Sequence, residues 1–207
     1  MTSPYRLALL TDPPTWCGTA LSGRSLDLLT ALAGSRDARM SDGALIEALW
    51  PGDLPAQPLR ALHVVVSRVR AVVGEGSVER SGDGYRLALP KTDVDVRDLS
   101  DRAERARACA VAGQWEQVLD LTDSLPQVPA CADADNTLGA GATPVARLRE
   151  WAARQAEEAR RDRGLALEAA GEHERAVALL REASQRDSGD ETVLAALMRA
   201  ESWVRSP

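Results

Sequence analysis

Apolar side chains recur at every third or fourth position between Gln57 and Val73, which is the spacing of one buried helix face. This stripe consists of Leu59, Leu62, Val66, Val69 and Val73. The other face carries Gln57, Arg60, Val64, Ser67 and Arg68. Pro58 suits the first turn of such a helix, where a missing N–H breaks no hydrogen bond. The pattern therefore predicts an amphipathic helix over residues 57–73.

Guanidinium, amide and hydroxyl groups on one helix face suit the phosphates and base edges of a DNA major groove. A strand, turn and strand follow between Ser77 and Leu89, reading SVER, SGDG and YRLAL. A helix with basic groups on its exposed face, closed by a short hairpin, is the layout of a winged helix-turn-helix. The same layout occurs in small domains that bind nothing, so it leaves both functions open.

Shorter elements are predicted ahead of this helix. Leu7 to Leu10 forms a short strand, residues 12–14 a turn with two prolines, and Thr15 to Leu21 a second strand. A first helix is predicted over residues 25–33, ended by Gly34, with Leu26, Leu29, Leu32 and Ala33 facing inward. A second helix, capped by Ser41 or Asp42, runs to Trp50, with its core side chains at Leu45, Leu49 and Trp50.

The pattern changes after Pro90, and from Arg97 onward helical periodicity replaces the strand signals. Two later segments, residues 110–121 and 168–180, each place a glycine between helices and a small or apolar residue five positions on. The pairs are Gly113 with Val118 and Gly171 with Ala176. Small side chains at such a corner let paired helices approach closely, so these segments predict tetratricopeptide-like hairpins.

Pro126 to Pro144 is rich in Ala, Gly, Asp and Pro and is predicted to be an exposed loop. Further helices are expected over residues 145–170, 172–186 and 190 or 191 to 204. The predicted fold is mainly α with small β. A winged helix-turn-helix domain covers residues 1–92, and an all-α tetratricopeptide-like domain covers residues 93–207.

Four segments, ALIEALWPGD, LHVVVSRVRAVVG, SGDGYRL and VDVRDLSDRAERARACAVAGQWEQVLDL, resemble in order and spacing the SARP-type transcriptional activators, the actinomycete antibiotic regulatory proteins. Members of that family join an OmpR-type winged helix to a helical bacterial transcriptional activation domain. The resemblance covers almost the whole chain. It implies binding of double-stranded promoter DNA at direct repeats by a homodimer, contact with RNA polymerase, and activation of a secondary-metabolite (antibiotic biosynthesis) gene cluster.

The exposed face and this resemblance together single out the candidate DNA-binding residues. Arg60, Val64 and Ser67 are expected at the bases, where Val64 can meet a thymine methyl group. The remaining candidates are Arg68 and Arg70 on the backbone, Arg80 and Arg86 in the hairpin, and His63. The family implies a core role for Trp50, which anchors the second helix to the recognition helix without touching DNA.

Alternative roles remain open for several of these side chains. Arg80 and Arg86 either border the minor groove or are solvated surface charges. His63 either donates to a phosphate or base edge or is merely solvated. Tyr85 packs under the hairpin or reaches a phosphate with its hydroxyl. The consecutive valines 64–66 leave few polar groups for base reading, which bears on sequence specificity.

The charge balance argues against DNA binding. The chain has 207 residues and a formal net charge of −6, and its first 90 residues hold nine Arg and nine Asp plus Glu. Nucleic-acid binders typically show a basic patch, and here it is limited to five arginines against three acids over residues 57–89. This balance favours a second hypothesis, a protein-interaction adaptor with a degenerate winged helix. A third is the N-terminal part of a larger regulator carrying an ATPase module.

Catalytic chemistry is not indicated. The two histidines fall in different predicted domains, and the sequence has no glycine-rich phosphate loop, nucleophile elbow or metal-ligand cluster. Three widely spaced cysteines suit small hydrophobic positions in a reducing compartment. The sequence also lacks an apolar run near the ~18 residues of a membrane span and a signal-peptide pattern. We therefore expect a cytoplasmic protein that is not an enzyme and needs no cofactor or metal.

Overall fold

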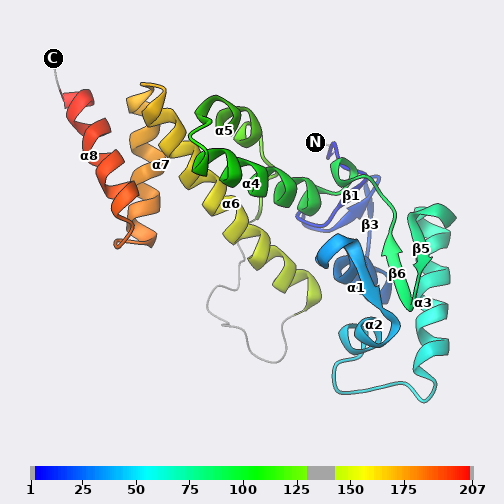
Figure 1. The fold of residues 1–207 in the computed structure, drawn as a ribbon. Coiled ribbons are helices and arrows are strands. Elements are labelled where there is room, and N and C mark those ends of the chain that lie inside the picture. The colour runs from blue at the N-terminus through cyan, green and yellow to red at the C-terminus, as the bar shows by residue number, and fades with distance from the viewer. Residues whose placement is uncertain (1–2, 130–142, 206–207) are drawn as a thin grey trace. The chain divides into compact units, whose positions relative to one another are not determined.

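The computed structural model describes residues 3–129 and 143–205 (Figure 1). Its contacts divide the chain into two compact units. The first comprises residues 1–98 and 126–151, and the second comprises residues 99–125 and 152–207. Helix α6, Pro144–Ala169, contributes to both. The domain boundary expected between residues 92 and 93 stays a prediction.

The first unit holds three helices and two small antiparallel sheets, with strand orders β1-β2-β3 and β4-β6-β5. The helices are α1 Gly23–Ala33, α2 Asp42–Leu49 and α3 Pro58–Val73. The strands are β1 Leu7–Ala8, β2 Thr15–Trp16, β3 Thr19–Ala20, β4 Arg39–Ser41, β5 Val78–Ser81 and β6 Gly84–Leu87. Helices α1, α2 and α3 pack on one another and on β6 or β5, and the β5–β6 hairpin follows α3. This arrangement confirms the predicted winged helix-turn-helix fold.

The N-terminal sheet differs from its prediction. The strand expected over Thr15 to Leu21 is two strands, β2 and β3, joined by a tight turn. Cys17 and Gly18 take positive φ values of 47° and 83° at this turn. Glycine reaches that region at no steric cost, so Gly18 allows the chain to reverse where an unbroken strand was expected.

Strand β4 was not predicted. It pairs with β6, placing Arg39 opposite Arg86, Met40 opposite Tyr85 and Ser41 opposite Gly84. Three residues carry too short an alternation to indicate a strand, and their partner lies more than 40 residues away in the sequence. Ser41 then caps α2, because its hydroxyl accepts a hydrogen bond from the Ala44 amide at 3.3 Å.

Two side chains that were predicted to face the core, one in α3 and one in α1, are not fully buried. Leu59, in the first turn of α3, is 53% exposed, and Val65 is buried in its place at 5%. In α1, Leu28 is fully buried whereas Leu26 is only half-buried. The other predicted α3 positions, Leu62, Val66, Val69 and Val73, form the buried face as expected. The predicted spacing of the buried stripe was correct. The spacing alone does not show how much of the length of α3 is covered by the neighbouring helices.

A buried carboxylate joins the N-terminal sheet to α4, Asp95–Val111. The two oxygens of Asp95 accept hydrogen bonds from the amides of Leu9 at 3.0 Å and Leu10 at 2.8 Å, and Oδ1 also accepts from the Val96 amide at 2.7 Å. Asp95 is only 2% exposed. Burial raises the pKa of Asp95 above its ordinary value, while the three N–H donors pull it back down.

The second unit is a stack of helical hairpins: α4, then α5 Trp115–Thr122, α6, α7 His173–Arg186 and α8 Glu191–Arg205. The hairpins turn at Gly113 and Gly171, whose φ values are 71° and 79°. Five residues beyond each glycine, Val118 and Ala176 are both fully buried. The predicted tetratricopeptide-like corners are therefore confirmed.

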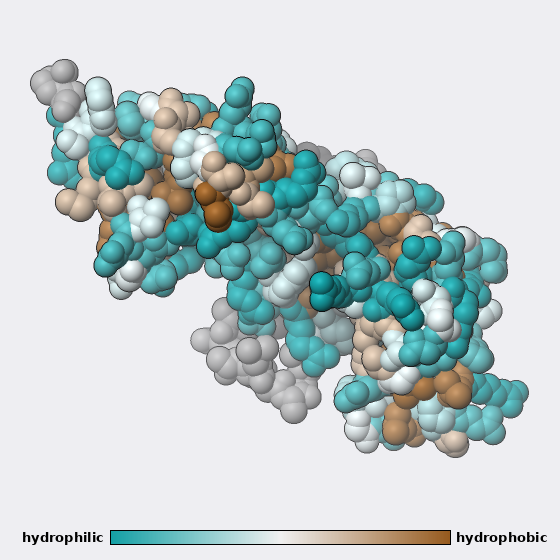
Figure 2. Space-filling view, in the orientation of Figure 1, coloured by the Kyte–Doolittle hydropathy of each residue, from teal (hydrophilic) through white to brown (hydrophobic). Residues whose placement is uncertain are grey.

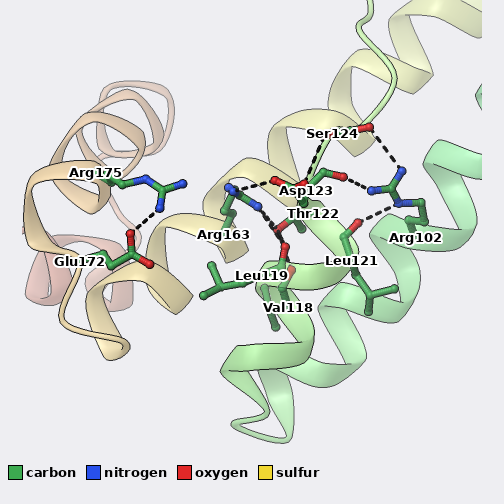
Figure 3. Close-up of polar contacts among 10 residues, drawn as sticks. All are labelled: Arg102, Val118, Leu119, Leu121, Thr122, Asp123, Ser124, Arg163, Glu172 and Arg175. Atoms are coloured by element: carbon green, nitrogen blue, oxygen red, sulfur yellow. Dashed lines mark hydrogen bonds and ion pairs between the residues drawn. The ribbon is translucent and has the colours of Figure 1, made fainter.

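Two arginines satisfy the carbonyl groups at the end of α5 (Figure 3). Arg163 donates to the Leu119 carbonyl at 3.0 Å and to the Thr122 hydroxyl at 3.1 Å. Arg102 donates to the Leu121 carbonyl at 2.9 Å and to the carbonyl of Asp123. The last carbonyls of a helix lack partners within the helix, so these contacts fix the end of α5 from two neighbouring helices.

The loop predicted over residues 126–144 is mostly untested, because residues 130–142, with Cys131 among them, lie outside the described part of the chain. A search of the described helices finds none long and apolar enough to cross a membrane.

Candidate nucleic-acid interface

The exposed side of α3 carries five of the eight predicted DNA-binding residues. Arg60, His63, Val64, Ser67 and Arg68 are all exposed, while the opposite side of the helix lies in the core. Pro58 occupies the start of α3 as predicted. The fold thus brings these five side chains onto one accessible helix surface, which we call the α3 face.

Both arginines of the α3 face remain open to solvent. Arg60 makes a long hydrogen bond of 3.5 Å to the Gln57 side-chain oxygen. Within the described residues, neither Arg60 nor Arg68 forms an ion pair. Their guanidinium groups can therefore meet an external anion without first breaking a salt bridge.

Arg70 lies apart from the α3 face. It is half-buried, and its Nε donates to the Val78 carbonyl at 2.8 Å. Its guanidinium also lies 5.9 Å from the centre of the Tyr85 ring. Arg70 thus links α3 to β5, and its Nε–H group is already used in a hydrogen bond within the first unit.

Arg80 extends from the hairpin toward the start of α2, with its side chain 48% exposed. Its two terminal nitrogens donate to both carboxylate oxygens of Asp42 at 2.7 and 2.8 Å, and its guanidinium lies 4.9 Å from the centre of the Tyr85 ring. The hydrogen bonds to Asp42 raise the pKa of Arg80. Tyr85 itself is 6% exposed, which supports the packing role among its two predicted ones. Arg80 therefore links the hairpin to the start of α2.

Arg86 lies on the outer surface of the same hairpin. It pairs with Glu79 at 2.8 Å, directly across the strands. On its other side stands Arg39 of β4, which pairs with Asp83 at 3.1 Å. Arg39 is a basic residue near the hairpin turn that the sequence did not single out, because only the non-local pairing of β4 with β6 brings it there.

A double-mutant cycle should show whether Arg80 and Asp42 stabilise the fold as a coupled pair. We expect Arg80→Ala and Asp42→Ala each to lower the melting temperature, and the double variant to lose less than their sum, because the pair is bidentate. Arg86→Ala, which removes an exposed single-contact pair, is the matched control and should have little effect. Additive losses at Arg80 and Asp42 would contradict the coupling.

Apolar side chains border the α3 face at its N-terminal end. Leu54 in the α2–α3 loop is 60% exposed and Leu59 is 53% exposed. Figure 2 shows brown surface at this end of the first unit, at the lower right of the view. An apolar rim beside exposed arginines suits a partner with both phosphate and apolar surface, such as a nucleic acid with its sugars and methyl groups.

Among the described residues, no group of three or more His, Cys, Asp or Glu side chains is placed to hold a metal ion. His63 belongs to the α3 face. His173 instead begins α7, where its ring stacks on Trp203 with centroids 5.3 Å apart. That contact gives His173 a packing role within the second unit.

Sequence comparison connects the chain to known regulators, although no family model matches it. Regulatory protein AfsR of Streptomyces griseus is 31% identical over 160 residues, which is 70% of this chain and 16% of AfsR. AfsR of Streptomyces coelicolor is 33% identical over 104 residues, 46% of this chain and 10% of that protein. The chain is related to the SARP-type regulators. It spans less than a fifth of the length of these SARP-type relatives.

The fold gives a second, more distant likeness. The structure of Mycobacterium tuberculosis EmbR in complex with a low-affinity phosphopeptide matches 94% of this chain with a TM-score of 0.68 and 22% identity. The match spans 54% of the EmbR chain. At this identity the likeness shows a shared fold, a winged helix followed by helices, as predicted from the sequence.

Proposed function

We propose that this chain binds double-stranded promoter DNA and activates transcription of a secondary-metabolite gene cluster. One observation carries the proposal: the α3 face combines two arginines that form no ion pair with any described residue, a hydroxyl and an apolar contact on one accessible helix. Such a helix after a helix-turn fits a major groove. Similarity to regulatory protein AfsR supports the regulatory role.

The proposal assigns different tasks to the eight candidate residues. Arg60, Val64 and Ser67 face the bases, and His63 and Arg68 lie at phosphates. Arg86 borders the DNA backbone from the hairpin. Arg70 and Arg80, which are held by Val78 and Asp42, act by fixing the position of the hairpin. The winged helix of residues 1–92 supplies these contacts, and the helical domain of residues 93–207 supplies protein contacts.

The partners follow from the same resemblance. Two protomers occupy direct repeats as a homodimer on DNA, and the helical domain contacts RNA polymerase. The protein works in the cytoplasm, without a cofactor and without catalysis. Since the AfsR relatives are several times longer, these activities are proposed for the regulator to which the matched segment belongs.

Selection from a pool of random duplex DNA tests this function. The chain is incubated with the pool at low salt, and the retained fragments are sequenced. We expect enrichment of a repeated motif, and loss of that enrichment in Arg60→Ala, which removes a base-facing group. If fragments are retained but no motif is enriched, the chain binds only the DNA phosphate backbone. That result would contradict sequence-specific regulation.

The adaptor hypothesis retains one specific observation in its favour. Arg80 and Arg86, both in the hairpin, are already neutralised by Asp42 and Glu79, so the winged helix offers DNA fewer free charges than its sequence suggests. An adaptor would bind no duplex DNA at low salt, and its helical unit would bind a protein instead. The pool experiment therefore distinguishes the two functions directly.

A further inference from the structure

A row of three charged side chains crosses the sheet of β4, β6 and β5. Arg39 of β4 is paired with Arg86 of β6, and Arg86 is paired with Glu79 of β5. Side chains at directly paired positions project from the same face of a sheet, with Cβ atoms about 4.5–5.5 Å apart. All three side chains are exposed. Arg39 therefore lies beside Arg86 on the outer face of the hairpin, although it comes from a segment before α2.

The two arginines of this row pair with different acids. Arg86 pairs with Glu79 at 2.8 Å. Arg39 extends to the hairpin turn, where its Nη2 donates to Oδ1 of Asp83 at 3.1 Å. A Cβ added to Gly82, the other residue of the turn, would lie 2.6 Å from the same nitrogen. The guanidinium group of Arg39 thus lies over the two-residue turn.

The turn itself is fixed in place and carries an exposed negative charge. Gly82 has a φ of 59°, which suits the first central position of a two-residue hairpin turn. The Asp83 carbonyl accepts a hydrogen bond from the Asp42 amide at 2.9 Å, so the turn is attached to the start of α2. The Asp83 side chain is 75% exposed. A carboxylate here repels any DNA phosphate within the ~10 Å Debye length, and Arg39 supplies the charge that cancels this repulsion.

Arg39 keeps donors available for an external anion. Its side chain is 47% exposed, and among the described residues its one hydrogen bond is the single contact to Asp83. A guanidinium group has several further N–H donors. Arg80 differs, because both of its terminal nitrogens donate to Asp42. Arg39 can therefore bind a phosphate oxygen while it remains paired with Asp83.

We propose that Arg39 binds a backbone phosphate of DNA at the hairpin turn and at the same time cancels the charge of Asp83. The proposal rests on the proposed function, in which Arg86, the neighbour of Arg39 on the same sheet face, borders the DNA backbone. It adds to the α3 face a second cationic contact that comes from β4. It also gives a reason for an acid at the turn, since Asp83 holds the guanidinium group of Arg39 over the turn.

Salt dependence of binding to the random duplex pool tests this role in the full chain. Arg39→Ala should weaken binding and reduce the slope of log K against log salt by about 0.9, because one phosphate contact is lost. Asp83→Asn should strengthen binding by roughly a few-fold, because it removes a repulsive charge and leaves Arg39 in place. The double variant should recover part of the affinity lost in Arg39→Ala. Its slope should still lie about 0.9 below that of Asp83→Asn.

Arg6→Ala is the matched control. Arg6 is also an exposed arginine of the first unit with a single contact to an acid, Asp93 at 3.4 Å, and its removal changes the net charge equally. It should leave the slope unchanged, and each of these single variants should keep the melting temperature of the wild type, because both ion pairs are exposed.

A wild-type slope in Arg39→Ala would overturn the proposal, as would equal slopes in Asp83→Asn and the double variant. If Arg68→Ala reduces the slope while Arg39→Ala does not, the role of Arg39 fails and the proposed function stands. Absence of wild-type binding at low salt would overturn both.

Discussion

Gly84→Ala is expected to detach the hairpin from the rest of the winged helix. A Cβ at this position would lie 1.9 Å from the Met40 carbonyl oxygen and 2.5 Å from the Ser41 Cα. Both atoms are backbone, so no side-chain movement relieves the overlap and β4 must separate from β6. We expect a loss of about 3 kcal/mol in the free energy of unfolding of the first unit, measured by urea denaturation.

The same substitution should also affect DNA binding, because the hairpin turn docks on α2. The Asp42 amide donates to the Asp83 carbonyl at 2.9 Å, next to Gly84. Hydrogen exchange at the β4 and β6 amides would locate the damage. Gly43→Ala is the control: it lies in α2 with nothing within 4 Å of a new Cβ, and alanine there should stabilise by about 0.5 kcal/mol. Equal stability of Gly84→Ala and the wild type would show that β4 does not pair as described.

Asp95→Ala is expected to be the most damaging change at the base of the first unit. It leaves the amides of Leu9, Leu10 and Val96 without their acceptor, in residues that are at most 1% exposed. An unsatisfied buried donor costs about 1–3 kcal/mol, and relief from burying a carboxylate offsets part of this. We expect a net loss of about 3 kcal/mol in a denaturant titration.

Asp93→Ala serves as the neighbouring control. Its carboxylate makes a single exposed pair with Arg6 at 3.4 Å, so its removal should cost under about 1 kcal/mol. Similar losses in the two variants would contradict the role given to Asp95.

The pH dependence of this effect has a definite sign. Burial raises the pKa of Asp95, so the Asp95 carboxylate is protonated more readily in the folded chain than in the unfolded chain. The stability that this titration contributes is fully present below the unfolded pKa and is lost as pH rises through the folded pKa. The stability of wild type relative to Asp95→Asn should therefore increase as pH falls from 7 toward 4. A decrease over that range would contradict the raised pKa.

The sequence predicted the features that depend on local periodicity. The spacing of Leu62, Val66, Val69 and Val73 was enough to orient α3, because burial of one helical face is a local pattern. Gly113 and Gly171 likewise marked the hairpin corners, because glycine readily adopts the positive φ that both residues show in the structure. Leu59 was wrongly predicted to be buried, because its exposure depends on how far the neighbouring helices extend along α3. The spacing of apolar residues does not contain that information.

The roles of the hairpin arginines depended on pairing that the sequence reveals only in part. Strand alternation places Arg80 on the same face as Tyr85 once their cross-strand pairing is known, and Arg86 on the opposite face. The different orientations of Arg80 and Arg86 were therefore predictable from the hairpin sequence alone. The partner Asp42 and the nearby Arg39 were not predictable, because both come from segments about 40 residues away.

Salt dependence of binding to the random duplex pool tests the central claim most directly, that the α3 face contacts DNA. Wild type should lose affinity steeply as salt rises, and Arg68→Ala, which removes one phosphate contact, should reduce the slope of log K against log salt by about 0.9. Arg60→Ala should weaken binding as well, whereas Arg105→Ala, an exposed arginine on α4, should change neither slope nor affinity. Absence of binding at low salt, or the same slope in Arg68→Ala as in wild type, would contradict the account.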